Sequence, residues 1–101
     1  MTLVAIITVL KDARDQFHAF ETHASAIMKT HGGCIERTVV VEDDGRPDVF
    51  KEIHVLTFPD ARAFAAYRSD PLLAGVAHLR EASVVGMEVF IGEDGPTYGA
   101  A

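Results

Sequence analysis

The segment that most constrains this chain is its first predicted strand, which is apolar on both of its faces. Residues 3–10 read Leu-Val-Ala-Ile-Ile-Thr-Val-Leu, so aliphatic side chains occupy odd and even positions alike. A strand with one face in water alternates apolar and polar residues. This strand must therefore be covered on both faces, yet the rest of the chain carries only two predicted helical regions, enough to cover one face of a small sheet.

The length of 101 residues corresponds to one domain, which we expect to span residues 1–92. Residues 93–101 have loop composition and are expected to form a flexible C-terminal tail. With 49% hydrophobic and 24% charged residues, the composition is that of a globular protein. The net charge of −6, with lysines and arginines scattered along the chain, argues against a nucleic-acid partner.

The single cysteine, Cys34, rules out an internal disulfide and favours a reducing, cytoplasmic location. We expect its thiol to be buried and structural. The apolar N-terminal segment ends at Lys11, too early for a signal peptide or a membrane span, so no membrane partner is expected. We expect no metal, because His18 and His23 are five residues apart and therefore point in different directions on a helix. We expect no cofactor, and Gly32-Gly33 precedes a predicted strand rather than a helix, so it lacks the context of a phosphate-binding loop.

The hydrophobic periodicity predicts the order strand, helix, strand, strand, helix, strand. The strands are expected at about residues 2–10, 34–42, 49–58 and 83–91. The first helix should begin after Asp12 as its N-cap and end at Gly32-Gly33. Its apolar stripe comprises Phe17, Phe20, Ala24, Ile27, Met28 and His31.

The second helical region should begin after Asp60 as its N-cap, with a break and a restart at Ser69-Asp70-Pro71. Leu72, Leu73, Val76 and Leu79 continue its apolar stripe. The whole order predicts a ferredoxin-like α+β fold, βαββαβ: a four-stranded antiparallel sheet with two helices on one face. The other face would be bare in a monomer, so we predict a homodimer in which two sheets enclose an α+β barrel.

Two segments carry a resemblance to a known superfamily. They are residues 31–33, His-Gly-Gly, and residues 58–71, from Phe58-Pro59-Asp60 to Tyr67-Arg68-Ser69-Asp70-Pro71. Over almost its whole length the chain resembles the dimeric α+β barrel superfamily. The two segments look most like an uncharacterised branch, although Ala66 stands where that branch usually has tryptophan. The second resemblance is to antibiotic-biosynthesis monooxygenase-like proteins. Because the superfamily includes cofactor-free oxygenases, haem-degrading enzymes and lactone isomerases, the resemblance implies a fold more than a reaction.

The third strand carries the best candidates for chemistry. Its even positions mix apolar residues such as Phe50 with Glu52 and His54, while its odd positions are rich in β-branched residues, which suits packing under the helices. If the even face lines the space between two sheets, His54 can serve as a general base oriented by Glu52. The alternative is structural: both groups are partly solvated at the barrel mouth or hydrogen-bonded across the dimer.

Strand two and the second helix supply further candidate ligand-binding residues. Depending on the hairpin register, either Glu36 or Arg37 faces His54, and Arg37 there would stabilise an anion. Alternatively, both are surface charges that protect an edge strand. Tyr67 can direct its hydroxyl into a cavity between helix and sheet, or it can be a core residue with a wet tip.

Three functions remain open from the sequence. The first is binding or transforming a small apolar or aromatic molecule in a cavity between sheet and helices, with Phe50 among the contacts. The second is a cofactor-independent monooxygenase or isomerase. The third is a structural dimer without a catalytic site, in which Phe50, Leu56, Phe58 and Phe90 fill the space. If His54 serves a site, its replacement by alanine should leave the fold nearly intact.

Overall fold

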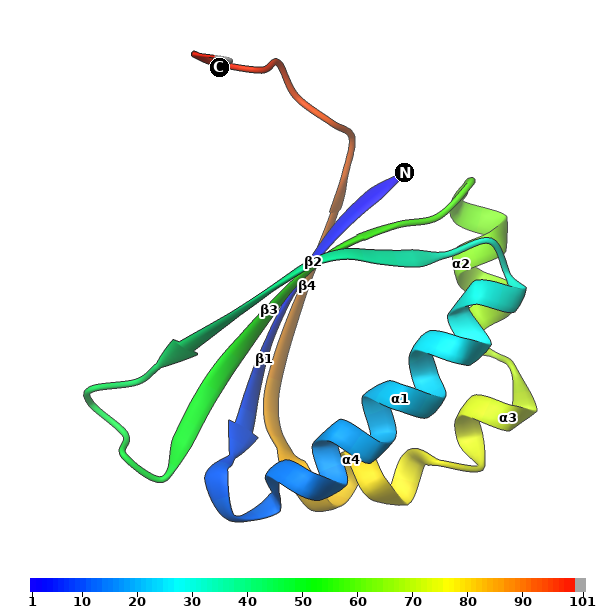
Figure 1. The fold of residues 1–101 in the computed structure, drawn as a ribbon. Helices are drawn as coiled ribbons and strands as arrows, with labels where there is room; N and C mark the ends of the chain where they lie inside the picture. Colours follow the sequence, from blue (N-terminus) through cyan, green and yellow to red (C-terminus); the bar gives the residue numbers. More distant parts are fainter. Residues whose placement is uncertain (100–101) are drawn as a thin grey trace.

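The computed structural model describes residues 1–99, and all of its helices lie on one side of a single sheet (Figure 1). The strands are β1 (Thr2–Leu10), β2 (Cys34–Glu42), β3 (Val49–Thr57) and β4 (Val84–Gly92). They pair antiparallel in the order β2-β3-β1-β4. The helices are a 3₁₀ turn, η1 (Lys11–Ala13), followed by α1 (Arg14–Thr30), α2 (Ala61–Arg68), α3 (Pro71–Ala74) and α4 (Ala77–Ser83). The predicted ferredoxin-like α+β fold is confirmed.

The C-terminal tail follows β4. Residues 93–99 form no helix or strand, and the Thr2 hydroxyl donates a hydrogen bond of 2.6 Å to the Asp94 carboxylate. The last two residues of the predicted tail, 100 and 101, lie outside the described part of the chain.

The start of the first helix differs from the prediction. Asp12 is not its N-cap, because residues 11–13 first make the 3₁₀ turn and α1 begins after Ala13, which has no capping side chain. Lys11 is held at the β2–β3 hairpin by its backbone N–H, 2.9 Å from the Asp48 carbonyl, and by its ammonium, 2.8 Å from Glu42. The chain therefore turns once before the helix can form. The predicted stripe from Phe17 to Met28 is buried.

The second helical region has the predicted caps but is divided into three pieces. The Asp60 carboxylate accepts from the Ala63 N–H at 2.9 Å, and the Asp70 carboxylate accepts from the Leu72 N–H at 2.9 Å. A further interruption at residues 75–76 separates α3 from α4. No residue of α2 or α3 is fully buried, and Leu72, which was expected in the apolar stripe, is 68% exposed.

The face of the sheet that meets the helices is the odd face of β1 and the even face of β3. Leu3, Ala5, Ile7 and Val9 are buried and pair with Leu56, His54, Glu52 and Phe50. The expectation that the odd residues of β3 pack under the helices is therefore wrong. Both faces of these strands are largely apolar, so the pattern alone did not distinguish them; the Phe17 ring packs edge-on to Phe50 at 6.5 Å and fixes the choice.

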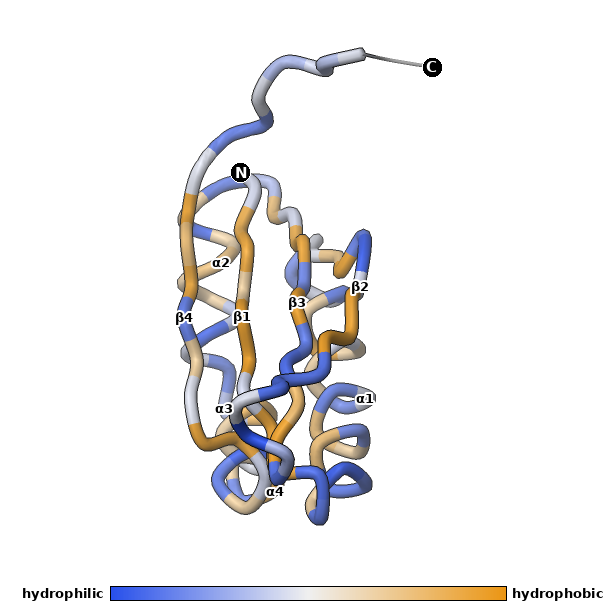
Figure 2. Tube along the Cα trace, turned by 90° about the vertical axis from the view of Figure 1, so that its left-hand side faces the viewer, coloured by the Kyte–Doolittle hydropathy of each residue, from blue (hydrophilic) through white to orange (hydrophobic). Residues whose placement is uncertain are grey.

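The opposite side of the sheet, which we call the outer face, has no helix over it (Figure 2). The strand registers place an apolar group of residues there. They are Val4, Ile6, Val39, Val41, Ile53, Val55 and Phe90. Phe90 is 55% exposed, and Val39 and Val41 are each 40% exposed. The uncovered second face that β1 predicted is therefore present in the single chain.

Candidate functional site

A cavity of about 560 Å³ lies between the helix-covered face of the sheet and the helices above it. Its floor is formed by the central strands and β4, and its roof by α1, α2, α3 and α4. The floor residues are Leu3, Ala5, Ile7, His54, Leu56, Met87, Val89 and Ile91. Met87, Val89 and Ile91 face the same side as the buried residues of β1, yet each is more than 40% exposed, so the cavity opens along β4.

Most of the wall is apolar, and four ionisable side chains interrupt it near one another. Glu21 comes from α1, His54 from β3, Tyr67 from α2 and Arg80 from α4. Arg68 lines the same cavity from the end of α2, where its guanidinium lies 5.6 Å from the centre of the Phe64 ring.

His54 and Glu52 form a buried pair on β3. The Nε2 atom of His54 lies 2.8 Å from Oε1 of Glu52, and the two residues are 3% and 8% exposed. They are two positions apart on one strand, so their side chains share a face and can meet without any contribution from another element. The structural alternative of a partly solvated pair at a barrel mouth does not hold, because both side chains are buried under the protomer's own helices.

The geometry leaves one nitrogen of His54 available. An ionised Glu52 can only accept a hydrogen bond, so Nε2 carries the proton and Nδ1 is left with a lone pair. Nδ1 makes no hydrogen bond to the described residues, and none of their buried side-chain nitrogen or oxygen atoms lacks a partner. Nδ1 therefore reaches open space, and the space that His54 lines is the cavity.

Glu21 is a half-buried carboxyl in the cavity roof. It makes no hydrogen bond or ion pair with the rest of residues 1–99. Burial raises the pKa of Glu21 above its usual value; a charged His54 acts in the opposite direction, and the charge of Glu52 raises the pKa further. The Glu21 carboxyl therefore stays protonated to a higher pH than an ordinary glutamate, and it lines the same cavity as His54.

Tyr67 is held by an aromatic cluster at one end of the cavity. Its ring centre lies 5.5 Å from that of Phe58, which in turn lies 5.2 Å from Phe64. Burial, together with the nearby charge of Glu21 and against an opposing effect of Arg80, raises the pKa of Tyr67 to about 12. Tyr67 lines the cavity wall, and the direction of its hydroxyl into the cavity stays a prediction.

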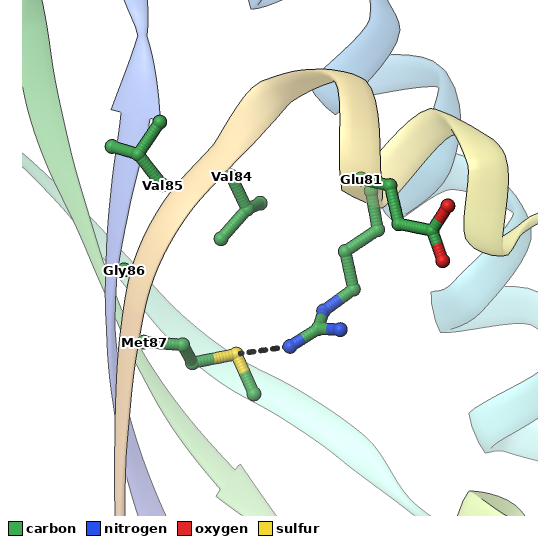
Figure 3. Close-up of a pocket in the computed structure, with 6 residues that line it drawn as sticks. Glu81, Val84, Val85, Gly86 and Met87 are labelled. Carbon is green, nitrogen blue, oxygen red and sulfur yellow. Dashed lines mark hydrogen bonds between the residues drawn. The ribbon is translucent and has the colours of Figure 1, made fainter.

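Arg80 stands between the cavity and a second, more open pocket of about 350 Å³. Its guanidinium donates to the Met87 sulfur at 3.8 Å, the contact drawn as a dashed line in Figure 3. No carboxylate lies within ion-pair distance of Arg80 in the part of the chain that the structure describes. Glu81, Val84 and Val85 line the second pocket but not the cavity.

Three predicted positions are corrected by the structure. Arg37 pairs with Val55, and a register shift around Glu36 leaves Thr38 opposite His54, so neither Glu36 nor Arg37 faces the histidine. Phe50 is 1% exposed beneath the Arg14 guanidinium, 4.4 Å from its ring centre, and does not line the cavity. Cys34 is exposed rather than buried, because it begins β2 at the edge of the sheet.

Glu21 is the cavity residue that sequence reasoning missed, although a signal was present. It lies four residues after Phe17 and three before Ala24, both of which belong to the buried stripe of α1. A charged residue at such a spacing interrupts an apolar helix face. That interruption marks a carboxyl directed toward the interior, and it could have been read from the sequence together with the stripe.

Other kinds of site are not seen among residues 1–99. No group of three side chains suited to hold a metal ion occurs in this range. No helix within it is long and apolar enough to cross a membrane.

Comparison with solved structures identifies the class of fold: the ferredoxin-like α+β fold of antibiotic-biosynthesis monooxygenase-like proteins. The cofactor-independent oxygenase SnoaB from Streptomyces nogalater matches with a TM-score of 0.64 and 15% identity, over 98% of this chain and 97% of that one. A structure described as an antibiotic biosynthesis monooxygenase matches with a TM-score of 0.67 and 14% identity, over 94% and 98% of the two chains.

A protein of unknown function from Rhodopseudomonas palustris matches with a TM-score of 0.70 and 13% identity, over 93% of this chain and 84% of that one. The resemblance stated from the sequence is confirmed at the level of fold. No family model matches the sequence, and no curated protein matches it.

Proposed function

We propose that the protein binds a small apolar or aromatic molecule in the cavity and uses His54 as a proton acceptor toward it. The observation that carries the proposal is the buried His54–Glu52 pair. The Nε2 atom of His54 lies 2.8 Å from the Glu52 carboxylate, and its Nδ1 atom is open to the apolar cavity. A neutral imidazole held by a carboxylate is a common general base. Glu52 orients the ring and stabilises the imidazolium that proton transfer creates.

The size of the cavity supports a ligand rather than a purely structural role. Small-molecule sites occupy about 300–1,000 Å³, a range that includes this cavity of about 560 Å³. Of the four bulky residues expected to fill such a space, Phe50 lies in the core and Phe90 lies on the outer face. Leu56 and Phe58 line the cavity without closing it.

Ligand-observed saturation-transfer NMR with 2-tetralone, a bicyclic aromatic ketone, tests the binding. The probe should bind the wild-type protein and should be displaced from it by 2-naphthol. Narrowing the cavity with Ala5→Phe, on the floor beside His54, should abolish the signal. Ala66→Phe makes the same change at an exposed position of α2 that does not line the cavity, so it is the matched control and should leave the signal intact. Equal binding by both variants would place the ligand elsewhere and refute the proposal.

Cofactor-independent oxygenation is the second candidate function, and the fold match to SnoaB favours it. In this reaction His54 would take a proton from an electron-rich aromatic substrate, and molecular oxygen would supply the oxidising power. An oxygen electrode with a dihydroxynaphthalene probe tests it. Consumption by the wild type that is lost in His54→Gln, while the circular dichroism of the variant stays that of the folded protein, would support the oxygenase. Wild-type consumption equal to that of the buffer would exclude it for this substrate class.

We also propose that two copies associate through the outer face, as the first strand predicts. The outer face carries the apolar group of seven residues that was defined above, which includes Val4 and Phe90, and no helix of the same chain covers it. Sedimentation velocity should give a dimer for the wild-type chain and a monomer for Ile53→Lys. Leu72→Lys, an exposed apolar position on the helical side, should remain dimeric. A monomeric wild-type protein would overturn this assignment without affecting the cavity.

A further inference from the structure

We propose that Glu21 is a second proton-transfer group of the cavity: it donates a proton from the roof while His54 removes one from the floor. This inference rests on the proposed function and gives it a reaction class. The class is redox-neutral proton transfer on a small apolar carbonyl compound, as in enolisation or the migration of a double bond next to a carbonyl.

The first argument is placement. Glu21 comes from α1 and His54 from β3, so the two groups enter the cavity from opposite layers of the fold. A flat molecule lying between the layers would present one face or edge to each of them. Enolisation needs such an arrangement, because the base must reach a C–H bond while the acid reaches the carbonyl oxygen.

The second argument is that no contact with another residue of the described chain accounts for a carboxyl on the core-facing side of α1. A carboxyl on a buried helix stripe normally has a partner, since burying an unpaired charge is unfavourable. Within residues 1–99 Glu21 has no hydrogen-bond or ion-pair partner, whereas Glu52 is engaged by His54. Glu21 is half-buried and no buried side-chain oxygen of the described residues lacks a partner, so its carboxyl is satisfied by water or by a molecule that enters the cavity.

The third argument is that the two carboxyls of the cavity region have been given different environments. Glu52 is hydrogen-bonded to His54 at 2.8 Å, whereas Glu21 has no such partner among residues 1–99, and burial raises the pKa of Glu21, which favours its protonated form. The other charged or titratable groups around Glu21 are Tyr67 and Arg68 on α2 and Arg80 on α4.

The proton and electron balance of the step is complete without a co-reactant. His54 Nδ1 takes a proton from the carbon next to the carbonyl, and the electrons of that C–H bond form the C=C bond of the enol. The carbonyl π electrons move to the oxygen, which takes the Glu21 proton. The products are a neutral enol, a Glu21 carboxylate and a His54 imidazolium paired with Glu52. Return of a proton to the same carbon gives exchange with solvent, and return to a more distant carbon gives isomerisation.

The test is deuterium incorporation at the acidic carbon of 2-tetralone in D₂O, followed by proton NMR with the full-length chain. We expect Glu21→Gln to bind the probe but to exchange it about 100-fold more slowly, the lower end of the usual contribution of a general acid. His54→Gln should exchange at the buffer rate. Glu36→Gln is the matched control, because it makes the same chemical change outside the cavity, and it should match the wild type.

The pH profile separates an acid from a merely structural residue. The Glu21 carboxyl loses its proton as pH rises through its raised pKa, whereas a glutamine at this position cannot ionise. The ratio of the wild-type exchange rate to the Glu21→Gln exchange rate should therefore fall as pH rises. A ¹³C carboxyl titration of the free protein should independently find the pKa of Glu21 above that of an ordinary glutamate.

The outcomes separate the two proposals. If 2-tetralone binds but the wild type exchanges it no faster than buffer, binding stands and the proton-transfer inference is refuted. If Glu21→Gln exchanges like the wild type with the same pH profile, His54 acts without Glu21. If the probe does not bind at all, the proposed function and this inference fall together. Oxygen-dependent product in place of exchange would also overturn the inference.

Discussion

The buried pair of His54 and Glu52 makes a quantitative prediction about stability. The variants are His54→Leu, Glu52→Leu and the double replacement, all of which keep the β3 backbone and fill similar volume. His54→Leu leaves the Glu52 carboxylate, 8% exposed, without its 2.8 Å partner. Leaving a buried carboxylate without its partner lowers the free energy of unfolding by about 3–5 kcal/mol.

The complementary replacement is less damaging. Glu52→Leu leaves a neutral imidazole with one unsatisfied N–H, which costs about 1–3 kcal/mol. The double variant has no buried polar group to satisfy, so its free energy of unfolding should lie within about 1 kcal/mol of the wild type. The single losses therefore should exceed the double loss by about 3 kcal/mol or more, a coupling at the upper end of those found between contacting residues.

Urea denaturation followed by circular dichroism at one fixed protein concentration measures the four free energies. For a domain of this size about 1 kcal/mol corresponds to roughly 4–8 °C in Tm, so His54→Leu should melt at least about 12 °C below the wild type. Additive losses in the two single variants would refute the coupled pair. The burial of Glu52 also revises the alanine prediction made from the sequence, since loss of His54 destabilises the protein whether or not His54 is catalytic.

Three further predictions concern the surroundings of the cavity. Gly33→Ala would place a Cβ 2.5 Å from Phe58 and 2.6 Å from Met28, so urea denaturation should show a loss of about 1–3 kcal/mol in the free energy of unfolding. Gly95→Ala, where a Cβ would have no atom within 4 Å, is the control and should leave this free energy unchanged; equal stability of the two variants would contradict the packing. Asp60→Ala removes the carboxylate that caps α2 and should reduce stability by about 1 kcal/mol, measured in the same way; Asp60→Asn, which keeps an acceptor oxygen, should restore most of it. Folding raises the pKa of Tyr67 from 10 to about 12, so the contribution of the neutral phenol to stability is complete below pH 10 and is lost as pH rises toward 12. In the Tyr98→Phe variant Tyr67 is the remaining tyrosine, and an ultraviolet titration should give a pKa near 12; ionisation near pH 10 would refute the burial of the Tyr67 side chain.

The sequence was sufficient for the fold because its signals were local and mutually consistent. Asp60 and Asp70 with Pro71 mark two helix starts, and the doubly apolar first strand marks a sheet with a second face to cover. Each of these depends on neighbouring residues alone, and each is confirmed in the structure. The start of α1 was misplaced because it depends on a distant contact of Lys11 with the β2–β3 hairpin.

The site was recovered only in part, for the same reason. His54 and Glu52 are two residues apart on one strand, so their contact was predictable without knowledge of the fold. Arg37 was misassigned because a register shift in β2 turned its side chain to the outer face. Which side of β3 the helices would cover could not be derived, since the apolar content of both sides was similar and tertiary packing made the choice.

The division of the second helical region into short pieces has a consequence for altering this protein. The floor of the cavity is part of the buried sheet, where each change risks unfolding the chain. The roof pieces α2 and α3 contain no fully buried residue, and their N-terminal ends are capped by Asp60 and Asp70. The Asp70 carboxylate also lies 2.8 Å from His31, the residue that follows α1. A library confined to the cavity-lining residues of α2 and α3 could change which molecules bind, while the sheet and the His54–Glu52 pair stay the same.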